Sequence, residues 1–113
     1  MGASTEVEAE STYLSPERIQ GLSYTVKSDV WSLGLTVFEL AIGKFPVGND
    51  LKGPVDILTL LRQIVYEPSP KLPKSDAFPT ILEEFIDLCL IKDPEKRPTP
   101  KELYVSCRLK MRD

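Results

Sequence analysis

The sequence contains no histidine and only two cysteines, Cys89 and Cys107, which stand in separate apolar helical patterns without a CxxC motif. A metal site made of imidazoles or paired thiolates therefore lacks its ligands. We expect both thiols to be reduced and packed against other apolar side chains. No residue of this chain is assigned as a metal ligand.

The sequence also lacks long apolar runs and a concentrated basic surface. No run approaches the roughly 20 apolar residues that cross a bilayer, and the start MGASTEVEAE lacks the cationic and apolar regions of a signal peptide. The formal net charge is −3, and the Lys and Arg residues are scattered along the chain. Nucleic-acid and membrane partners are therefore disfavoured, and a cytoplasmic protein is expected.

Composition divides the chain into three stretches. Residues 1–11 alternate small residues with glutamates and contain almost nothing to bury, which predicts a disordered acidic leader. Residues 12–108 carry the apolar side chains of one domain, and residues 109–113 form a short tail. A chain of 113 residues with 42% apolar content is long enough for one core and too short for two domains of ordinary size.

Apolar spacing and helix-breaking residues predict helices and no strand, so the expected fold class is mainly α. Ser15 and Pro16 are suited to begin a short helix, and Gly21 is suited to end it. The longer predicted helices are residues 29–42 with Ser28 as N-cap and Gly43 as terminator, 54–66 opening at Pro54, 79–91, and a last helix from about Thr99.

The predicted helix 29–42 is apolar around nearly its whole circumference. Only Ser32, Thr36 and Glu39 form a narrow polar stripe. Such a helix needs cover on almost every side, and this chain offers only three other main helices and loops. We therefore expect part of its surface to stay exposed in this chain, at a cost comparable to the stability of a small domain.

Three short motifs follow one another along the chain: SPE at residues 15–17, DVWSLG at residues 29–34, and KRPT around Arg97. Each alone is weak, because SPE is also an ordinary capped helix start and Asp29 also suits the positive first turn of a helix. In this order they resemble the C-terminal helical lobe of a eukaryotic protein kinase, from the end of the activation segment through the last four main helices. The lobe is incomplete, and the resemblance covers roughly residues 11–105.

Finer details resemble one branch of that family. The stretches STYLSPERIQG and IVYEPSPKLP, and the insert after GKFP, are similar to MAP kinase kinases, especially fungal ones. These are dual-specificity kinases for Ser, Thr and Tyr. The resemblance implies a kinase that phosphorylates Thr and Tyr in a MAP kinase activation loop with ATP and Mg²⁺.

The resemblance implies structural roles for four residues of the motifs. Glu17 and Arg97 would form a buried ion pair that fixes the activation segment to the lobe. Asp29 would accept amide hydrogen bonds from the catalytic loop, and Trp31 would belong to the core. A generic helical domain unrelated to kinases would instead leave the placement of Glu17 and Arg97 accidental.

The resemblance also assigns a loop. Tyr13, Leu14 and Ser15 correspond to the segment that receives the substrate residue after the phosphorylated one. The alternative is an ordinary connection without a binding role. Just before this loop Ala9-Glu10 stand where the family has Gly-Thr, so the leader departs from the kinase pattern.

Phosphoryl transfer needs a Gly-rich loop, a strand lysine, a catalytic Asp, and Asp and Asn ligands for Mg²⁺. None is recognisable: there is no DFG, and the only Arg-Asp pair is Arg112-Asp113. The sole asparagine, Asn49, has Lys44 where the catalytic Asp would stand five residues earlier. The sequence therefore assigns no catalytic or cofactor-binding residue. The chain alone is predicted to be catalytically inactive and to bind neither ATP nor Mg²⁺.

Two functional hypotheses remain open at this point. In the first, the chain is part of a MAP kinase kinase whose partners are a MAP kinase substrate and, as further candidates, a scaffold or an upstream kinase. In the second, it is a non-catalytic interaction or decoy module that binds a MAP kinase or a scaffold through residues 54–66.

Overall fold

The computed structural model describes residues 12–48 and 56–111, and these form helices and loops without a strand. The helices are α2 (Pro16–Ile19), α3 (Val26–Ile42), α4 (Ile57–Tyr66), α5 (Thr80–Cys89) and α6 (Pro100–Met111). Within the described ranges, no helix combines the length and apolar character needed to cross a bilayer. The predicted leader, residues 1–11, lies outside the described residues.

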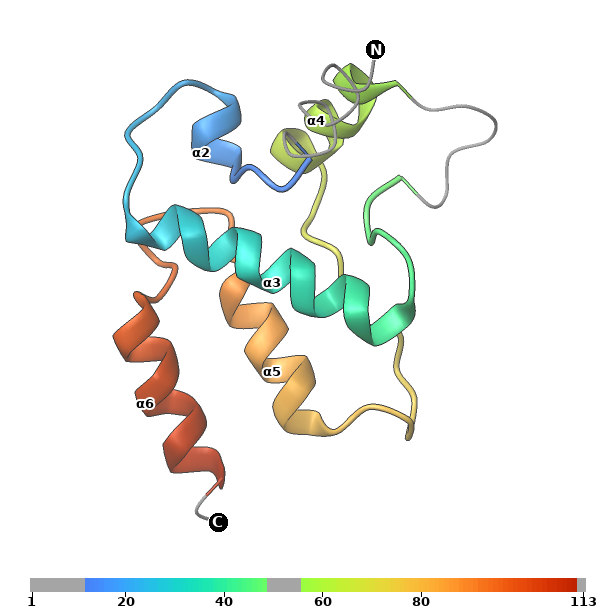
Figure 1. The fold of residues 1–113 in the computed structure, drawn as a ribbon, viewed down its shortest axis with the longest axis vertical. Helices are drawn as coiled ribbons and strands as arrows, with labels where there is room; N and C mark the ends of the chain where they lie inside the picture. The colour runs from blue at the N-terminus through green and yellow to red at the C-terminus, as the bar shows by residue number, and fades with distance from the viewer. Residues whose placement is uncertain (1–11, 49–55, 112–113) are drawn as a thin grey trace.

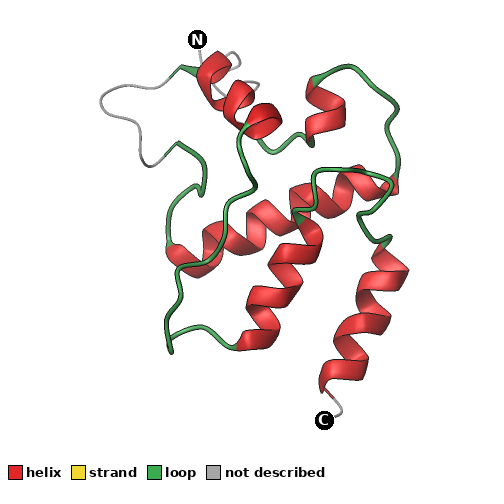
Figure 2. Ribbon diagram, turned by 180° about the vertical axis from the view of Figure 1, so that it is seen from behind, coloured by secondary structure: helices red, strands yellow, loops and turns green. Residues whose placement is uncertain are grey.

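Helix α3 lies across the middle of the molecule and separates the other helices into two groups (Figure 1). Helices α5 and α6 lie on one side, where α5 contacts both α3 and α6. Helices α2 and α4 lie on the other side and contact each other. The view from behind shows the same division, with long loops connecting the two groups (Figure 2).

The first turn of α3 differs from the sequence prediction. Thr25, not Ser28, is the N-cap, and its Oγ1 accepts a hydrogen bond from the Lys27 amide at 3.1 Å. Ser28 lies inside the helix, and its Oγ accepts a hydrogen bond from the Thr25 amide at 3.4 Å. The prediction failed because two candidate caps stand three residues apart and the reciprocal bonding of a capping box favours the earlier one. Gly43 ends the helix with φ 79, as predicted.

Helices α4 and α5 are shorter than their sequence patterns, whereas α6 begins where its pattern predicts. Helix α4 begins at Ile57 because Asp56 caps it, its Oδ1 accepting from the Thr59 amide at 2.8 Å. The predicted opening at Pro54 lies outside the described residues. Helix α5 runs from residue 80 to 89 rather than 79–91. Helix α6 begins next to Thr99 as predicted, with reciprocal hydrogen bonds between Thr99 and Glu102.

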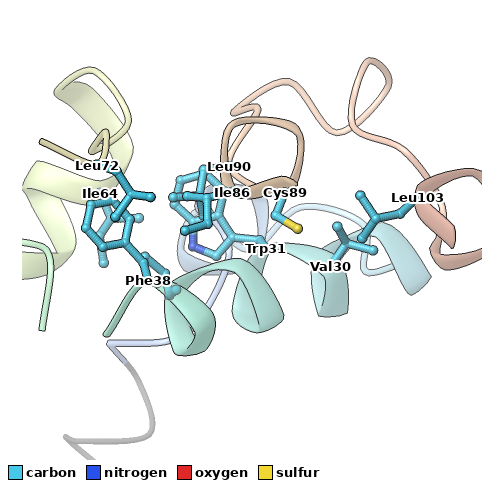
Figure 3. Packing of buried hydrophobic residues seen from close by; sticks show 10 residues of the cluster. Val30, Trp31, Phe38, Ile64, Leu72, Ile86, Cys89, Leu90 and Leu103 are labelled. Atoms are coloured by element: carbon cyan, nitrogen blue, oxygen red, sulfur yellow. The ribbon is translucent and has the colours of Figure 1, made fainter. Parts of the chain in front are cut away.

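The core is one apolar cluster that α3 shares with both groups of helices. Trp31 is fully buried at its centre, with Phe38 and Ile64 towards one end and Val30 and Leu103 towards the other (Figure 3). The cluster consists of Val30, Trp31, Leu35, Phe38, Ile64, Leu72, Ile86, Cys89, Leu90 and Leu103. Leu72 comes from the proline-rich loop after α4, so this extended segment is held against the core.

One side of α3 is only partly covered by the described residues. Val26, Leu33 and Leu40 are 56%, 46% and 79% exposed and follow one another at seven-residue intervals. Residues spaced by seven lie on one face of a helix, so they form an apolar stripe along α3. The sequence predicted that part of this helix would stay exposed, and the stripe identifies the face.

Candidate functional site: a buried ion pair and the loop that precedes it

Arg97 and Glu17 come from segments 80 residues apart and meet in the interior. Arg97 Nη1 lies 2.8 Å from Glu17 Oε2, and Nη2 lies 3.0 Å from Oε1, so the pair is a two-pronged fork. Arg97 is 1% and Glu17 3% exposed. The fork ties helix α2 to the loop that leads into α6.

The remaining donors of Arg97 are also used. Nε donates to the Ile91 carbonyl at 2.7 Å, Nη1 to the Lys27 carbonyl at 2.9 Å, and Nη2 to the Lys92 carbonyl at 3.1 Å. A guanidinium has five N–H groups, and all five therefore have a partner. Arg97 thus joins the start of α3, the end of α5 and the α2 carboxylate at one point.

Glu17 is held in its ionised form by its partners. Burial alone would raise the pKa of its carboxyl group, but hydrogen bonds from Arg97 and Ser28 outweigh that effect and lower the pKa to about 2. The Ser28 Oγ donates to Oε2 at 2.7 Å. Ser28, predicted as the N-cap, therefore belongs to the capping box and also donates to the ion pair. The second role depends on a contact that local sequence patterns do not reveal.

Trp31 contacts the same arginine. The Arg97 Cζ atom lies 5.3 Å from the centre of the Trp31 ring, within the range of a cation–π interaction. The structure places Trp31 in the core, where the sequence interpretation put it. Its indole N–H has no hydrogen-bond partner in the described part of the chain.

The loop of Tyr13, Leu14 and Ser15 is fastened to α3. The Tyr13 hydroxyl donates to Glu39 Oε1, and Ser32 Oγ donates to the Tyr13 carbonyl at 2.6 Å. Ser15 is fully buried, and its Oγ accepts from the Arg18 amide at 3.4 Å as the cap of α2. The loop therefore runs between an anchor on α3 and the helix that carries Glu17.

Sequence reasoning recorded Ser32 and Glu39 only as members of a polar stripe and assigned them no role. Their spacing of seven residues was the available signal, because it places both on one helix face. What the sequence did not show is that the loop before α2 crosses this face. That contact joins residues 26 positions apart.

Asp29 is exposed at the start of α3 and does not lie in the buried cluster. Its Oδ1 accepts from the Tyr24 hydroxyl at 2.5 Å, and this hydrogen bond raises the pKa of Tyr24. The expected partner of Asp29, the amides of a catalytic loop, is not recognisable in this sequence, so that role stays a prediction. Its partner in the structure, Tyr24, stands five residues earlier in the loop between α2 and α3.

Residues 12–48 and 56–111 contain no group of three or more His, Cys, Asp or Glu side chains placed to hold a metal ion. Asn49 lies outside the described residues. The ion pair and the contacts of the loop with α3 can brace and position a segment of the chain.

A comparison with protein families decides what this lobe is. The sequence model of the protein kinase domain matches residues 2–106. This chain belongs to the protein kinase family. The mainly helical architecture agrees with the C-terminal lobe of the kinase fold. The predicted resemblance to protein kinases and the predicted mainly α fold class are both confirmed. The matched range includes most of residues 1–11, which the sequence analysis separated as a leader.

Among kinases, the relatives of this chain are MAP kinase kinases. It is 62% identical over 100 residues to the mitogen-activated protein kinase kinase MST7 of Pyricularia oryzae, covering 83% of this chain and 24% of MST7. It is 41% identical over 145 aligned positions to the dual specificity protein kinase FUZ7 of Mycosarcoma maydis, covering 82% of this chain and 33% of FUZ7. It is 48% identical over 93 residues to mitogen-activated protein kinase kinase 3 of Arabidopsis thaliana, covering 81% of this chain and 17% of that protein.

The chain thus spans a third or less of the length of these kinases. The predicted similarity to fungal MAP kinase kinases is confirmed. The Gly-rich loop, the strand lysine and the DFG motif of kinases are absent from this sequence.

Helix α4 presents a second surface of this kinase lobe. Only Ile64 of the helix is fully buried, while Leu58 and Tyr66 are 68% and 76% exposed. Leu58, Arg62 and Tyr66 are spaced by four residues and lie on the outer face. These two large hydrophobic side chains on either side of an exposed arginine form a face that the described residues leave largely uncovered.

Proposed function

We propose that this chain acts as the C-terminal-lobe part of a MAP kinase kinase that phosphorylates Thr and Tyr in the activation loop of a MAP kinase, using ATP. The lobe braces the activation segment and positions the protein substrate. The nucleotide and Mg²⁺ bind mainly to kinase-domain elements that this sequence does not encode. A soluble cytoplasmic location suits these partners.

The buried fork of Arg97 and Glu17 is the observation that carries the proposal. Breaking a buried ion pair costs about 3–5 kcal/mol because the remaining charge is left without a partner. This buried ion pair fixes helix α2 to the start of α3. The loop of Tyr13, Leu14 and Ser15, which leads into α2, is fixed with it. A braced loop next to a fixed helix supports a role in holding a substrate segment.

Two proteins test the proposal: the chain alone, and a chimaeric kinase in which residues 12–108 replace the matching stretch of MST7. Each is incubated with labelled ATP, Mg²⁺ and a purified MAP kinase, and phosphorylated residues are identified by mass spectrometry. We expect Thr and Tyr phosphorylation by the chimaera and no transfer by the chain. Transfer by the chain alone, or an inactive chimaera that is folded, would contradict the proposal.

The outer face of α4 favours a second candidate function, a non-catalytic module that binds a MAP kinase or scaffold. Exposed Leu58 and Tyr66 are the supporting observation. The chain is immobilised and tested for capture of a purified MAP kinase, with Leu58→Ser as the variant and Leu109→Ser, on α6, as the matched exposed-leucine control. Micromolar binding that only Leu58→Ser abolishes would support the module, and equal binding of both variants would remove it.

A further inference from the structure

The indole N–H of Trp31 is a buried donor without an acceptor. Trp31 is 0% exposed, and no acceptor among the described residues reaches its Nε1 atom. Buried indole N–H groups usually have a partner, because an unpaired donor loses its hydrogen bond to water without a replacement. The surroundings of this atom are therefore the place to search for a binding site.

A cavity of about 450 Å³ lies against Trp31, between the end of α4 and the loops that follow α3 and α5. Sites for small molecules have volumes of about 300–1,000 Å³. In Figure 3 the nitrogen of the Trp31 ring lies on the side of the ring towards Phe38 and Ile64, and Ile64 also lines the cavity. The unpartnered donor therefore faces the cavity. The remaining apolar lining includes Pro46, Val47, Pro68 and Pro70.

Of the described residues that line the cavity, only Lys92 and Glu67 carry a charge. The Lys92 Nζ atom donates to the Val65 carbonyl at 3.1 Å and to the Glu67 carbonyl. Burial lowers the pKa of Lys92, whereas the nearby charge of Glu67 raises it. The two side chains thus compensate each other, and the lining has no excess of either sign.

We propose that this cavity, named here the Trp31 cavity, binds a small uncharged molecule whose carbonyl oxygen accepts the hydrogen bond of the Trp31 indole. The proline and valine side chains would contact the apolar body of the molecule. The half-buried Gln63 amide, which also lines the cavity, can bond a second polar atom. An anion would gain Lys92 as a neighbour but would be repelled by Glu67, so a neutral acceptor fits better.

The Trp31 cavity is a further site and does not depend on the proposed function. It shares no residue with the loop of Tyr13, Leu14 and Ser15, nor with the outer face of α4 formed by Leu58, Arg62 and Tyr66. Its occupancy can therefore be measured without phosphate transfer and without a protein partner.

The experiment uses the indole signal of Trp31, the sole tryptophan, in the nuclear magnetic resonance spectrum of the full chain labelled with ¹⁵N-tryptophan. The probes are benzamide, benzoate and toluene, which share one ring and offer a neutral carbonyl, an anion and no acceptor. Val47→Phe fills the cavity, and Val105→Phe, at a 47% exposed position of α6, is the matched control. The melting temperature of the chimaeric kinase with each probe is the second readout, which does not require the chain to fold alone.

Benzamide is expected to shift the indole signal saturably and to bind about tenfold more tightly than toluene, the equivalent of one hydrogen bond. Benzoate should bind more weakly than benzamide, and Glu67→Gln should strengthen its binding by removing the repelling carboxylate. Val47→Phe should abolish binding, whereas Val105→Phe should bind as the parent does. Benzamide should also raise the melting temperature of the chimaera but not that of its Val47→Phe variant.

Three outcomes would overturn the inference. The first is the absence of both a saturable indole shift and a rise in melting temperature, which would leave a buried water molecule as the acceptor. The second is equal affinity for benzamide and toluene, which would show that the indole donor is not used. The third is benzamide binding that persists in Val47→Phe, which would place the site elsewhere. The Glu67→Gln variant, at an exposed position, separates a lost site from a lost fold.

Discussion

Arg97 concentrates five hydrogen bonds and one ring contact in a single buried side chain. No other residue type has a planar set of five donors, so neither lysine nor an apolar residue replaces it. Exchanging the charges of Glu17 and Arg97 would therefore not restore the interactions of the pair. A glutamate at position 97 would face three backbone carbonyls that arginine now satisfies.

Arg97→Met is expected to lower the free energy of unfolding by about 3–5 kcal/mol, because Glu17 stays buried without its partner. The exposed pair of Lys110 and Glu84, with N and O 2.5 Å apart, provides the matched control. Lys110→Met should cost at most about 1 kcal/mol. Urea unfolding followed by the fluorescence of Trp31, the sole tryptophan, measures both. Equal losses in the two variants would contradict the account.

The pKa of Glu17 predicts how stability depends on pH. Folding lowers this pKa from 4.5 to about 2, so the ionised carboxylate stabilises the fold above about pH 4.5, and this contribution is lost as the pH falls towards 2. The variant Glu17→Gln lacks the charge and should show a flatter decline between pH 5 and pH 3. Urea midpoints across this interval test it. Parallel curves for both proteins would show that Glu17 does not titrate in this way.

At the scale of elements, α3 and α5 pack closely at Gly34. A Cβ added there would lie 2.4 Å from Cys89 Cβ and 3.0 Å from Leu90 Cδ2. Real Cβ atoms do not approach a neighbouring Cβ so closely, so the two helices would have to move apart. Gly34 is therefore needed for the contact that carries most of the core.

Gly34→Ala is expected to destabilise the fold by about 1–3 kcal/mol through overpacking, although alanine by itself favours helix by about 1 kcal/mol. Thr36→Ala, two residues later on the exposed side of the same helix, should change stability by less than about 1 kcal/mol. Thermal unfolding followed by circular dichroism compares the two. A stabilised Gly34→Ala would mean that α3 and α5 are further apart than described.

Much of the element order was predictable from sequence because caps and apolar spacing act locally. Gly43 and the start of α6 at Thr99 are where their patterns put them. Errors arose where two local signals competed, as at Thr25 and Ser28. The fork of Glu17 and Arg97 was expected only through family resemblance, and the contact of Tyr13 with Glu39 was missed, because pairings across many residues leave no local periodicity.

On the scale of the whole molecule, the apolar stripe of Val26, Leu33 and Leu40 is a departure from a self-sufficient fold, because three large apolar side chains stay exposed along one helix. Next to it, a groove of about 380 Å³ lies between α3, α5 and α6, lined by residues that include Leu33, Phe85 and Leu103. In the proposed full kinase this surface belongs to an intramolecular contact. In the chain alone it favours self-association.

Leu40→Lys tests whether the apolar stripe of α3 is covered in the full kinase. In the isolated chain it should reduce self-association, measured by sedimentation, without lowering stability, because Leu40 is 79% exposed. In the chimaeric kinase it should lower stability by about 2 kcal/mol or more, since a leucine is buried there. Leu58→Lys on the outer face of α4 is the control and should be tolerated in both. Tolerance of Leu40→Lys in the chimaera would show that the stripe is not covered.

The central claim is that this lobe works as part of a longer kinase, and the mass of the endogenous protein tests it most directly. An antibody raised against a peptide of residues 66–78 captures the protein from cells for blotting and intact-mass measurement. The account predicts a species several times heavier than 12.7 kDa. A single species near 12.7 kDa would contradict it and would make the non-catalytic binding module the better explanation.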